Sequence, residues 1–343
     1  MTTALTELRT DPPGTWAQRL RHFDHWGLTL ATVALFVTLS VVAPYFLTAQ
    51  NLLNVLQQSA FVGLIALAMT FVIVAGEIDI SVGSAMAFAS ALFGVLVSQH
   101  GWSLPVAAVV VLVVGGAVGL FSGLIRVVFD VPSFIVTLGL FSILRGLAQM
   151  LTDAVPIRIT NAGFTTWGNG DILGVPIPAI IMFAFLAACW FMLTRTTFGR
   201  SVFAVGGNAD AARLSGINVA RVRVLVFVLT GTAAAVAGIL VSAQLSSGDS
   251  TIGAGAEFTA ISAVIIGGAS LFGGRGSVVG TFLGVLFLGI LGNGMVLLDL
   301  SSYAQGVARG LIVLSAVVIS AQRDGVNPVT VIADRIRRAR STR

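Results

Sequence analysis

Apolar runs of about 20 residues recur along the whole chain, and they constrain its fold more than any other feature. A helix of that length covers the roughly 30 Å of hydrocarbon in a bilayer, and only helices and closed barrels can cross one. Only 10% of the residues are charged, against about 25% in soluble domains, and the mean hydropathy is +0.98. The sequence therefore predicts an all-α polytopic membrane protein.

The apolar runs predict about ten transmembrane helices. They lie at about 27–47, 52–74, 80–98, 104–125, 133–152, 176–194, 223–243, 258–272, 277–298 and 303–321. This pattern divides the chain into an N-terminal segment, 1–26, a transmembrane domain, 27–321, and a basic tail, 322–343.

The basic residues predict the orientation of these spans, because arginine and lysine gather on the cytoplasmic side of a membrane protein. All nineteen basic residues are arginines. With a cytoplasmic N-terminus, ten spans return the C-terminus to the same side, and every arginine except Arg145, Arg158 and Arg309 is then cytoplasmic. We therefore expect both termini and the loop 195–222 in the cytoplasm.

Two longer connections, 153–175 and 244–257, are then external. They are arginine-poor and rich in Gly, Thr, Asn and Asp. Composition alone leaves two interpretations open: a docking surface for an outside partner, or solvated connections.

Several classes of function are disfavoured by composition. A chain without lysine has neither a phosphate-binding Walker A loop nor a lysine Schiff base. The three histidines lack metal-ligand spacing, and no Ser/His/Asp set lies within the spans. We expect no catalytic residue, metal or cofactor in this chain; if ATP is used, another subunit binds it with Mg²⁺. The net charge of +5 reflects orientation signals and lipid contact, not nucleic-acid binding.

The stretch "GGNADAARLSGINVARVRV", 206–224, interrupts the apolar pattern with the signals of a short capped helix. Asn208 is a good N-cap, Asp210 falls in the first turn, Arg213 near the last, and Gly216 suits the left-handed stop. These signals predict a helix at about 209–215, which is too short to be stable without packing. Four small residues would let a partner approach closely: Ala209, Ala211, Ala212 and Ser215. The alternative is a positive-inside loop with a chance helix, which does not explain the cap and stop signals.

Glu77 and Asp79 interrupt two apolar runs between Gly76 and Gly83. A carboxylate costs about 2.5–3.5 kcal/mol at mid-bilayer and little near an interface. The predicted topology places the break toward the cytoplasm. A loop or helix-cap role and a role lining the exit of a transport path both remain open, whereas a proton relay lacks titratable partners in the neighbouring spans.

Arg145 and Arg309 lie within apolar runs, where a guanidinium must be paired or hydrogen-bonded. Asp153 and Asp299 are the candidate partners, and contact with substrate hydroxyls or a partner protomer is the alternative. The candidate residues of a translocation pathway are then Glu77, Asp79, Ser81, Arg145, Asn293 and Arg309.

Glycines at intervals of four predict closely packed helices, because small residues let helix backbones approach in a membrane. Two such series are Gly115, Gly119, Gly123 and Gly276, Gly280, Gly284. The sequence "LFGGRGSVVG", 271–280, has glycines but no lysine, so it predicts a tight cytoplasmic turn, not a phosphate loop.

Four motifs, in order, resemble those of the ribose-type sugar permeases of ABC importers. They are "AGEIDISVGSAMA" at 75–87, "FIVTLGLFSILRGL" at 134–147, "FGRSVFAVGGNADAARLSGINVARVRV" at 198–224 and "AISAVIIGGASLFGGRGSVVGTFLGV" at 260–285. The resemblance covers nearly the whole membrane region, about 45–321. One departure is Glu77, which stands where the family pattern, usually G-G-I-D-L-S-V-G, has a small residue.

The resemblance implies a permease subunit of the bacterial plasma (inner) membrane, gated by a separate ATPase. It implies three partners: that ATPase, a periplasmic or extracellular sugar-binding protein, and a second permease copy or paralogue. It also implies that the 206–217 segment supplies the coupling helix. The residues expected to meet the ATPase are Gly207, Asn208, Asp210, Ala211, Ala212, Arg213, Leu214, Gly216 and Ile217.

Two other functions remain open at this stage. An ion-coupled secondary transporter would need acidic residues deep in the bundle, and few lie away from span ends. A branched-chain amino-acid permease of related architecture differs mainly in solute. The sequence names no solute.

Overall fold

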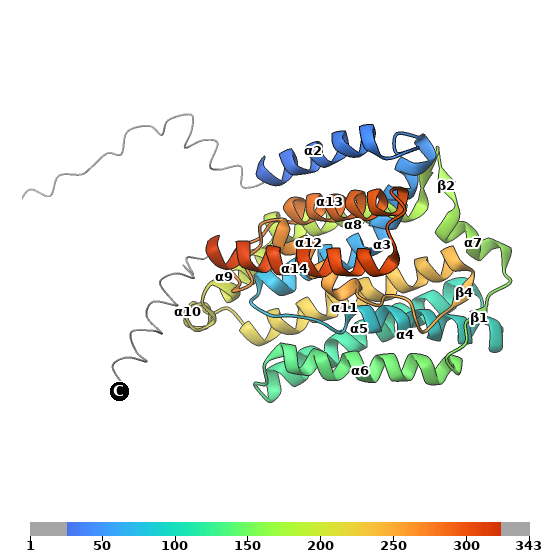
Figure 1. Ribbon diagram of the computed structural model, residues 1–343. Coiled ribbons are helices and arrows are strands. Elements are labelled where there is room, and N and C mark those ends of the chain that lie inside the picture. Colours follow the sequence, from blue (N-terminus) through green and yellow to red (C-terminus); the bar gives the residue numbers. More distant parts are fainter. Residues whose placement is uncertain (1–25, 324–343) are drawn as a thin grey trace, which may run out of the picture.

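The computed structural model describes residues 26–323, which form a bundle of long helices (Figure 1). The predicted tail, 322–343, and the predicted N-terminal segment, 1–26, lie almost entirely outside these residues.

A helix stands at each of the ten predicted positions. These helices are α2 (Trp26–Val42), α3 (Ala49–Val74), α4 (Val82–Gly94) continued by the π-helix η1 (Val95–Gln99), α5 (Leu104–Val128), α6 (Ser133–Thr152), α8 (Ile177–Arg195), α11 (Val219–Leu245), α12 (Ala256–Ile266), α13 (Val278–Leu297) and α14 (Ser302–Arg323).

Among the described residues, seven helices are long and apolar enough to cross a membrane: α3, α4 with η1, α5, α6, α8, α11 and α13. The chain is therefore a polytopic α-helical membrane protein. Helices α2 and α12 are apolar but shorter, with 17 and 11 residues.

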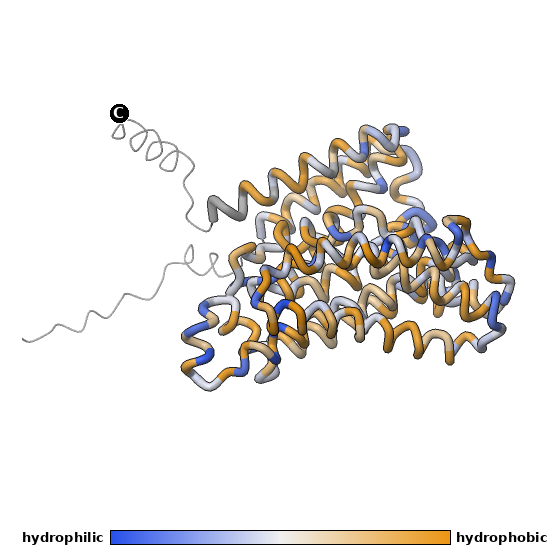
Figure 2. Tube along the Cα trace, turned by 90° about the horizontal axis from the view of Figure 1, so that it is seen from below, coloured by the Kyte–Doolittle hydropathy of each residue, from blue (hydrophilic) through white to orange (hydrophobic). Residues whose placement is uncertain are grey.

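Short elements lie at the two ends of the bundle (Figure 1). At one end are α9 (Thr197–Gly207) and α10 (Ala209–Leu214). At the other are α7 (Ala162–Asn169) and two antiparallel strand pairs: β1 (Ile157–Arg158) with β4 (Ser247–Gly248), and β2 (Asp171–Ile172) with β3 (Val175–Pro176). Figure 2 shows hydrophilic residues mainly toward these two ends and hydrophobic residues along the helices between them.

Helix α3 forms the centre of the core, and its second half is apolar on every side. Every residue from 63 to 74 is buried, as expected for a helix without a polar face. Helices α8, α11, α12 and α13 all pack against it. The outer helices α5, α6 and α8 bury less than a third of their apolar windows and leave the rest facing outward.

The predicted close helix packing is confirmed. A Cβ at Gly115 would lie 2.6 Å from the Cβ of Ala235, and one at Gly119 would collide with the carbonyl oxygen of Phe227. These contacts bring α5 and α11 backbone to backbone along a seam. In the second series, a Cβ at Gly284 would collide with the Ala263 carbonyl, so α13 packs equally closely on α12.

The predicted connection 244–257 is present as the non-helical segment 246–255, and its external position stays a prediction. This segment includes β4 and runs along α4 inside the bundle before α12 starts at Ala256. A Cβ at Gly248 would lie 2.7 Å from the Cα of Gly94, and one at Gly253 would lie 2.5 Å from the Gly83 carbonyl oxygen. Gly94 and Gly83 are about 16 Å apart along a helix, so the segment descends about that far into the bundle. Only glycines allow this approach, which hydropathy does not reveal.

We predict that Gly119→Ala destabilises the protein by about 1–3 kcal/mol, because the added Cβ forces the α5 and α11 backbones apart. The control is Gly139→Ala on α6, where a Cβ meets nothing within 4 Å and helix propensity improves. The midpoint of thermal aggregation in mild detergent measures the effect. Equal midpoints for the two variants would contradict a stabilising role for the close packing of α5 on α11.

Candidate functional site

Helix α10 has the local structure that its sequence predicts. The side chain of Asn208 accepts hydrogen bonds from the backbone N–H groups of Asp210 and Ala211, at 3.0 and 2.9 Å. Gly216 has φ +83°, the left-handed stop. The helix ends at Leu214, one residue earlier than predicted.

The predicted small face of α10 needs correction, because two of its residues face the protein itself. Ala212 is buried, and Ala209 and Ile217 pack against the core cluster beneath it. The short helix thus has the packing surface that its length requires.

The outer face of α10 consists of polar and small residues together with one large apolar side chain. Gly207, Asn208, Asp210, Ala211, Arg213, Leu214, Ser215 and Gly216 are all exposed. Asp210 and Arg213 form an exposed ion pair at 3.1 Å. Leu214 is 91% exposed at the tip of the helix, an apolar side chain that residues 26–323 leave uncovered.

Helix α9, which precedes α10, packs its backbone against the end of α3. A Cβ at Gly206 of α9 would collide with the carbonyl oxygen of Val74, which also accepts a 2.8 Å hydrogen bond from the N–H of Gly274. Gly273 and Gly274 have positive φ, so the predicted tight turn at 271–280 is confirmed. Three segments therefore meet at the last turn of α3.

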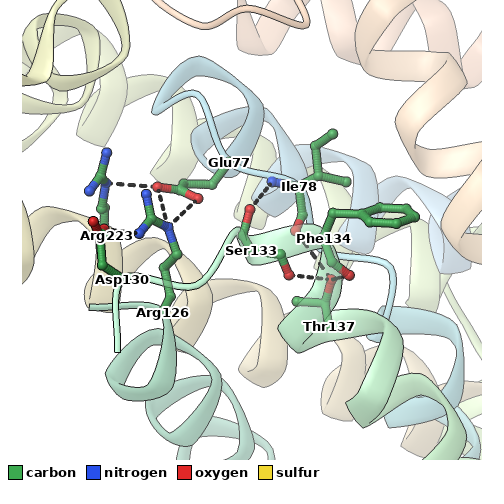
Figure 3. A network of polar contacts seen from close by, with 8 residues as sticks. All are labelled: Glu77, Ile78, Arg126, Asp130, Ser133, Phe134, Thr137 and Arg223. Carbon is green, nitrogen blue, oxygen red and sulfur yellow. Dashed lines mark hydrogen bonds and ion pairs between the residues drawn. The ribbon is translucent and has the colours of Figure 1, made fainter. Parts of the chain in front are cut away.

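Glu77 follows directly and is the centre of an ion-pair network (Figure 3). Its carboxylate is 4% exposed and lies 3.0 Å from Nε of Arg126, at the end of α5, and 2.7 Å from Nε of Arg223, in the first turns of α11. The first contact has hydrogen-bond geometry and the second is an ion pair only. Arg126 also pairs with Asp130 at 2.8 Å.

The two carboxylates bound to Arg126 differ in burial. Asp130 is 89% exposed, in the connection between α5 and α6. The Arg126 guanidinium holds the pKa of the Asp130 carboxyl below its usual value by hydrogen bonding and charge attraction. Asp130 thus adds a negative charge at the exposed surface of the network, whereas Glu77 binds both arginines from the buried side.

Asp79 and Ser81 stabilise the rest of the connection between α3 and α4 through hydrogen bonds. The Asp79 carboxylate accepts hydrogen bonds from the Ser81 hydroxyl and from Thr230 of α11, at 2.6 and 2.7 Å. On the α6 side, Ser133 accepts from the N–H of Ile78 and Thr137 from that of Ile80 (Figure 3 shows the first). These contacts favour the loop and helix-cap interpretation; the pathway role of Glu77, Asp79 and Ser81 remains a prediction.

The other candidate pathway residues lie elsewhere. Arg145, on α6, donates hydrogen bonds to the carbonyl oxygens of Ser250 and Ile252, at 2.6 and 3.0 Å, so the predicted Asp153 or Asp299 partner is wrong. Asn293, on α13, exchanges two amide hydrogen bonds with Asn51 of α3. Arg309 lies on α14, and its side chain is outside the described part. The five candidates whose side chains the structure describes therefore do not form a single cluster.

Sequence reasoning missed the partners of Glu77. The positive-inside rule already accounts for Arg126 and Arg223, so sequence reasoning does not place them in the site. A usable signal does exist: both arginines lie at span ends on the side where Glu77 breaks the apolar pattern. A buried carboxylate in a membrane protein calls for such partners.

Comparisons with known proteins identify relatives over most of the chain. Residues 51–317 match the family described as branched-chain amino acid transport system / permease component. The probable ABC transporter permease protein YphD of Escherichia coli is 47% identical over 298 residues, 87% of this chain and 90% of that protein.

Two further relatives carry sugar names. The ribose import permease protein RbsC of Haemophilus influenzae is 42% identical over 295 residues, 84% of this chain and 90% of that protein. The L-arabinose ABC transporter permease protein AraH of Azospirillum brasilense is 36% identical over 298 residues, 87% of each chain. No solved structure matches this chain.

We predict that Glu77→Gln destabilises the protein by about 3 kcal/mol, because it leaves two largely buried guanidinium groups without their carboxylate. Asp130→Asn is the matched control: it removes a charge from the same Arg126 at an exposed position and should cost under about 1 kcal/mol. Thermal aggregation midpoints in detergent compare the two. If Asp130→Asn proves as damaging as Glu77→Gln, burial does not set the importance of Glu77.

Proposed function

The chain belongs to the ribose-type sugar permeases of ABC importers, and we propose that it is the transmembrane subunit of an ATP-driven importer for a sugar or sugar-like solute. The proposal includes three partners. A soluble binding protein delivers the solute outside, a second permease copy or paralogue completes the pathway, and an ATPase subunit binds ATP and Mg²⁺ inside. The membrane is the plasma (inner) membrane of a bacterium.

The solute class rests on the relatives that match along the whole chain. The family description names branched-chain amino acids, whereas relatives at 42% and 36% identity carry the names of ribose and L-arabinose. A sugar is therefore the solute we propose, and a branched-chain amino acid is the comparison solute in its test.

The proposed topology has ten crossings, with both termini in the cytoplasm. Helix α12 alone covers about 16 Å, too little for a bilayer, but the segment 246–255 supplies the missing depth. The end of the bundle that carries α10 also carries Arg126, Arg195, Arg200, Arg213, Arg221, Arg223 and Arg275, and the opposite end carries Arg158 in β1. This asymmetry supports a cytoplasmic position for α10.

The observation that carries the coupling role is the exposed outer face of α10. A helix of six residues whose inner side packs on the core and whose tip presents Leu214 to solvent is suited to insertion into a partner's groove. Movement of α10 reaches the spans by two routes. One runs through Gly206 to the end of α3, and the other through Arg223 and the start of α11.

We predict that Leu214→Asp separates the permease from its ATPase. Leu214 has little contact with the other residues that the structure describes, so the variant should fold normally and lose the intermolecular contact. The tagged permease is purified from its native host in mild detergent, and copurifying ATPase activity is measured. We expect a loss of about tenfold or more, equivalent to about 1.4 kcal/mol of binding free energy.

The matched control is Leu173→Asp, since Leu173 is 99% exposed at the opposite end of the bundle. It should retain the ATPase. If no ATPase copurifies even with the unaltered chain, the importer proposal fails. Uptake driven by an ion gradient in proteoliposomes, without ATP, would then support a secondary transporter.

The solute is tested with the reconstituted complex. Uptake of radiolabelled ribose, L-arabinose, xylose and leucine into proteoliposomes is followed with binding protein and ATP present. Uptake of leucine alone would overturn the sugar assignment and leave the importer mechanism intact.

A further inference from the structure

In the proposed topology the non-helical segment 246–255 lies at membrane depth, where backbone is normally helical. It begins beside Gly94, near the end of α4, and reaches Gly83, in the first turn of that helix. Arg145, which binds its carbonyl groups, lies on α6 about 10 Å before the end of that span. The segment therefore replaces part of a transmembrane helix with unwound chain.

Polar side chains from other helices satisfy the inner side of this segment. Arg145 donates to the carbonyl oxygens of Ser250 and Ile252, and the hydroxyl of Ser90 on α4 accepts from the N–H of Asp249 at 2.9 Å. The Asp249 carboxylate accepts from the N–H and the hydroxyl of Thr251, at 2.7 and 2.8 Å.

The outer side of the segment is open. Thr251 and Ala254 are exposed, and Phe258, in the first turn of α12, is 52% exposed. Figure 1 shows the segment crossing the face of the bundle between α14 and α6. Irregular backbone with polar groups cannot face lipid, because hydrocarbon offers no hydrogen bonds. Either water or protein must cover this face.

Glu257 gives an independent indication of water. Its side chain is 2% exposed, at the start of α12, yet Oε2 has no hydrogen-bond partner among the described residues. A buried oxygen of this kind is normally satisfied by water or a polar ligand. This oxygen lies against Gly83, where the segment also meets α4, so a water molecule or polar ligand that satisfied it would lie beside the segment.

We propose that the segment 246–255, with Arg145 behind it, lines the solute pathway. This inference rests on the proposed function and names the wall that a second permease copy would face across the pathway. The wall is chemically suited to a polyhydroxylated solute. Asp249, the backbone carbonyls and the Thr251 hydroxyl oxygen, whose own proton goes to Asp249, accept hydrogen bonds from the hydroxyl groups of such a solute. Broken spans near the membrane interior are a general way of presenting such groups.

Cysteine accessibility tests the proposal directly. In a Cys189→Ala background, Thr251→Cys and Ala254→Cys are each compared with Val113→Cys, which is 66% exposed at the middle of α5. The probe is a charged, membrane-impermeant methanethiosulfonate, which reacts with thiolates in water. The complete complex with its ATPase is labelled in proteoliposomes, both without nucleotide and with ATP and vanadate, so that both gating states are sampled.

We expect both segment cysteines to react about tenfold or more faster than Val113→Cys in at least one state, because they would face water and the cysteine at position 113 would face lipid. Leu173→Cys, in an exposed turn, serves as the positive control. The reagent should also stop ribose uptake in the Ala254→Cys complex, and dithiothreitol should restore it.

The proposal is overturned if both segment cysteines stay as unreactive as Val113→Cys in every state while Leu173→Cys labels. Cysteines at two positions, 251 and 254, keep the test valid if one variant misfolds. Size-exclusion profiles identify a misfolded variant. Labelling does not require transport, so a failure here is distinct from a failure of the importer proposal, which uptake by the unlabelled complex measures.

Discussion

A bilayer supplies no hydrogen bonds, so every break in a membrane helix must find its partners within the protein. Within residues 26–323, the segments 75–81 and 246–255 are two such breaks, and side chains of neighbouring helices bind polar groups of both. Thr230, Ser133 and Thr137 serve the first, and Arg145 and Ser90 serve the second. The arrangement of α4, α6, α11 and α12 follows from these contacts.

The two breaks meet at the start of α4. Glu257, in the first turn of α12, lies against Gly83, in the first turn of α4. Two helix N-termini therefore converge inside the bundle, where their unpaired N–H groups favour negative charge. This field accounts for carboxylates near both starts, Asp79 at one and Glu257 at the other.

Sequence reasoning predicted the helices well, because the cost of exposing polar groups to lipid forces long apolar runs. It also predicted the cap at Asn208, the stop at Gly216 and the close packing at Gly119, where local chemistry decides the outcome. It failed for contacts between distant residues. Arg145 was expected to need a carboxylate, but it donates hydrogen bonds to two backbone carbonyls. A hydropathy pattern also does not reveal that the glycine-containing segment 246–255 packs inside the bundle without forming a helix.

Helix α11 connects the two ends of the proposed mechanism. It follows α10 after only four residues, it is about 40 Å long, and it ends at Leu245, directly before the segment 246–255. The glycine seam holds it to α5, and Glu77 bridges both helices at the α10 end. Packed cores switch between discrete arrangements and do not deform continuously, so we expect the closely packed α5 and α11 to move together. Under the proposed function, a displacement of α10 by the ATPase would therefore reach the pathway wall through a rigid element, with Glu77 fixing the end at which the force enters.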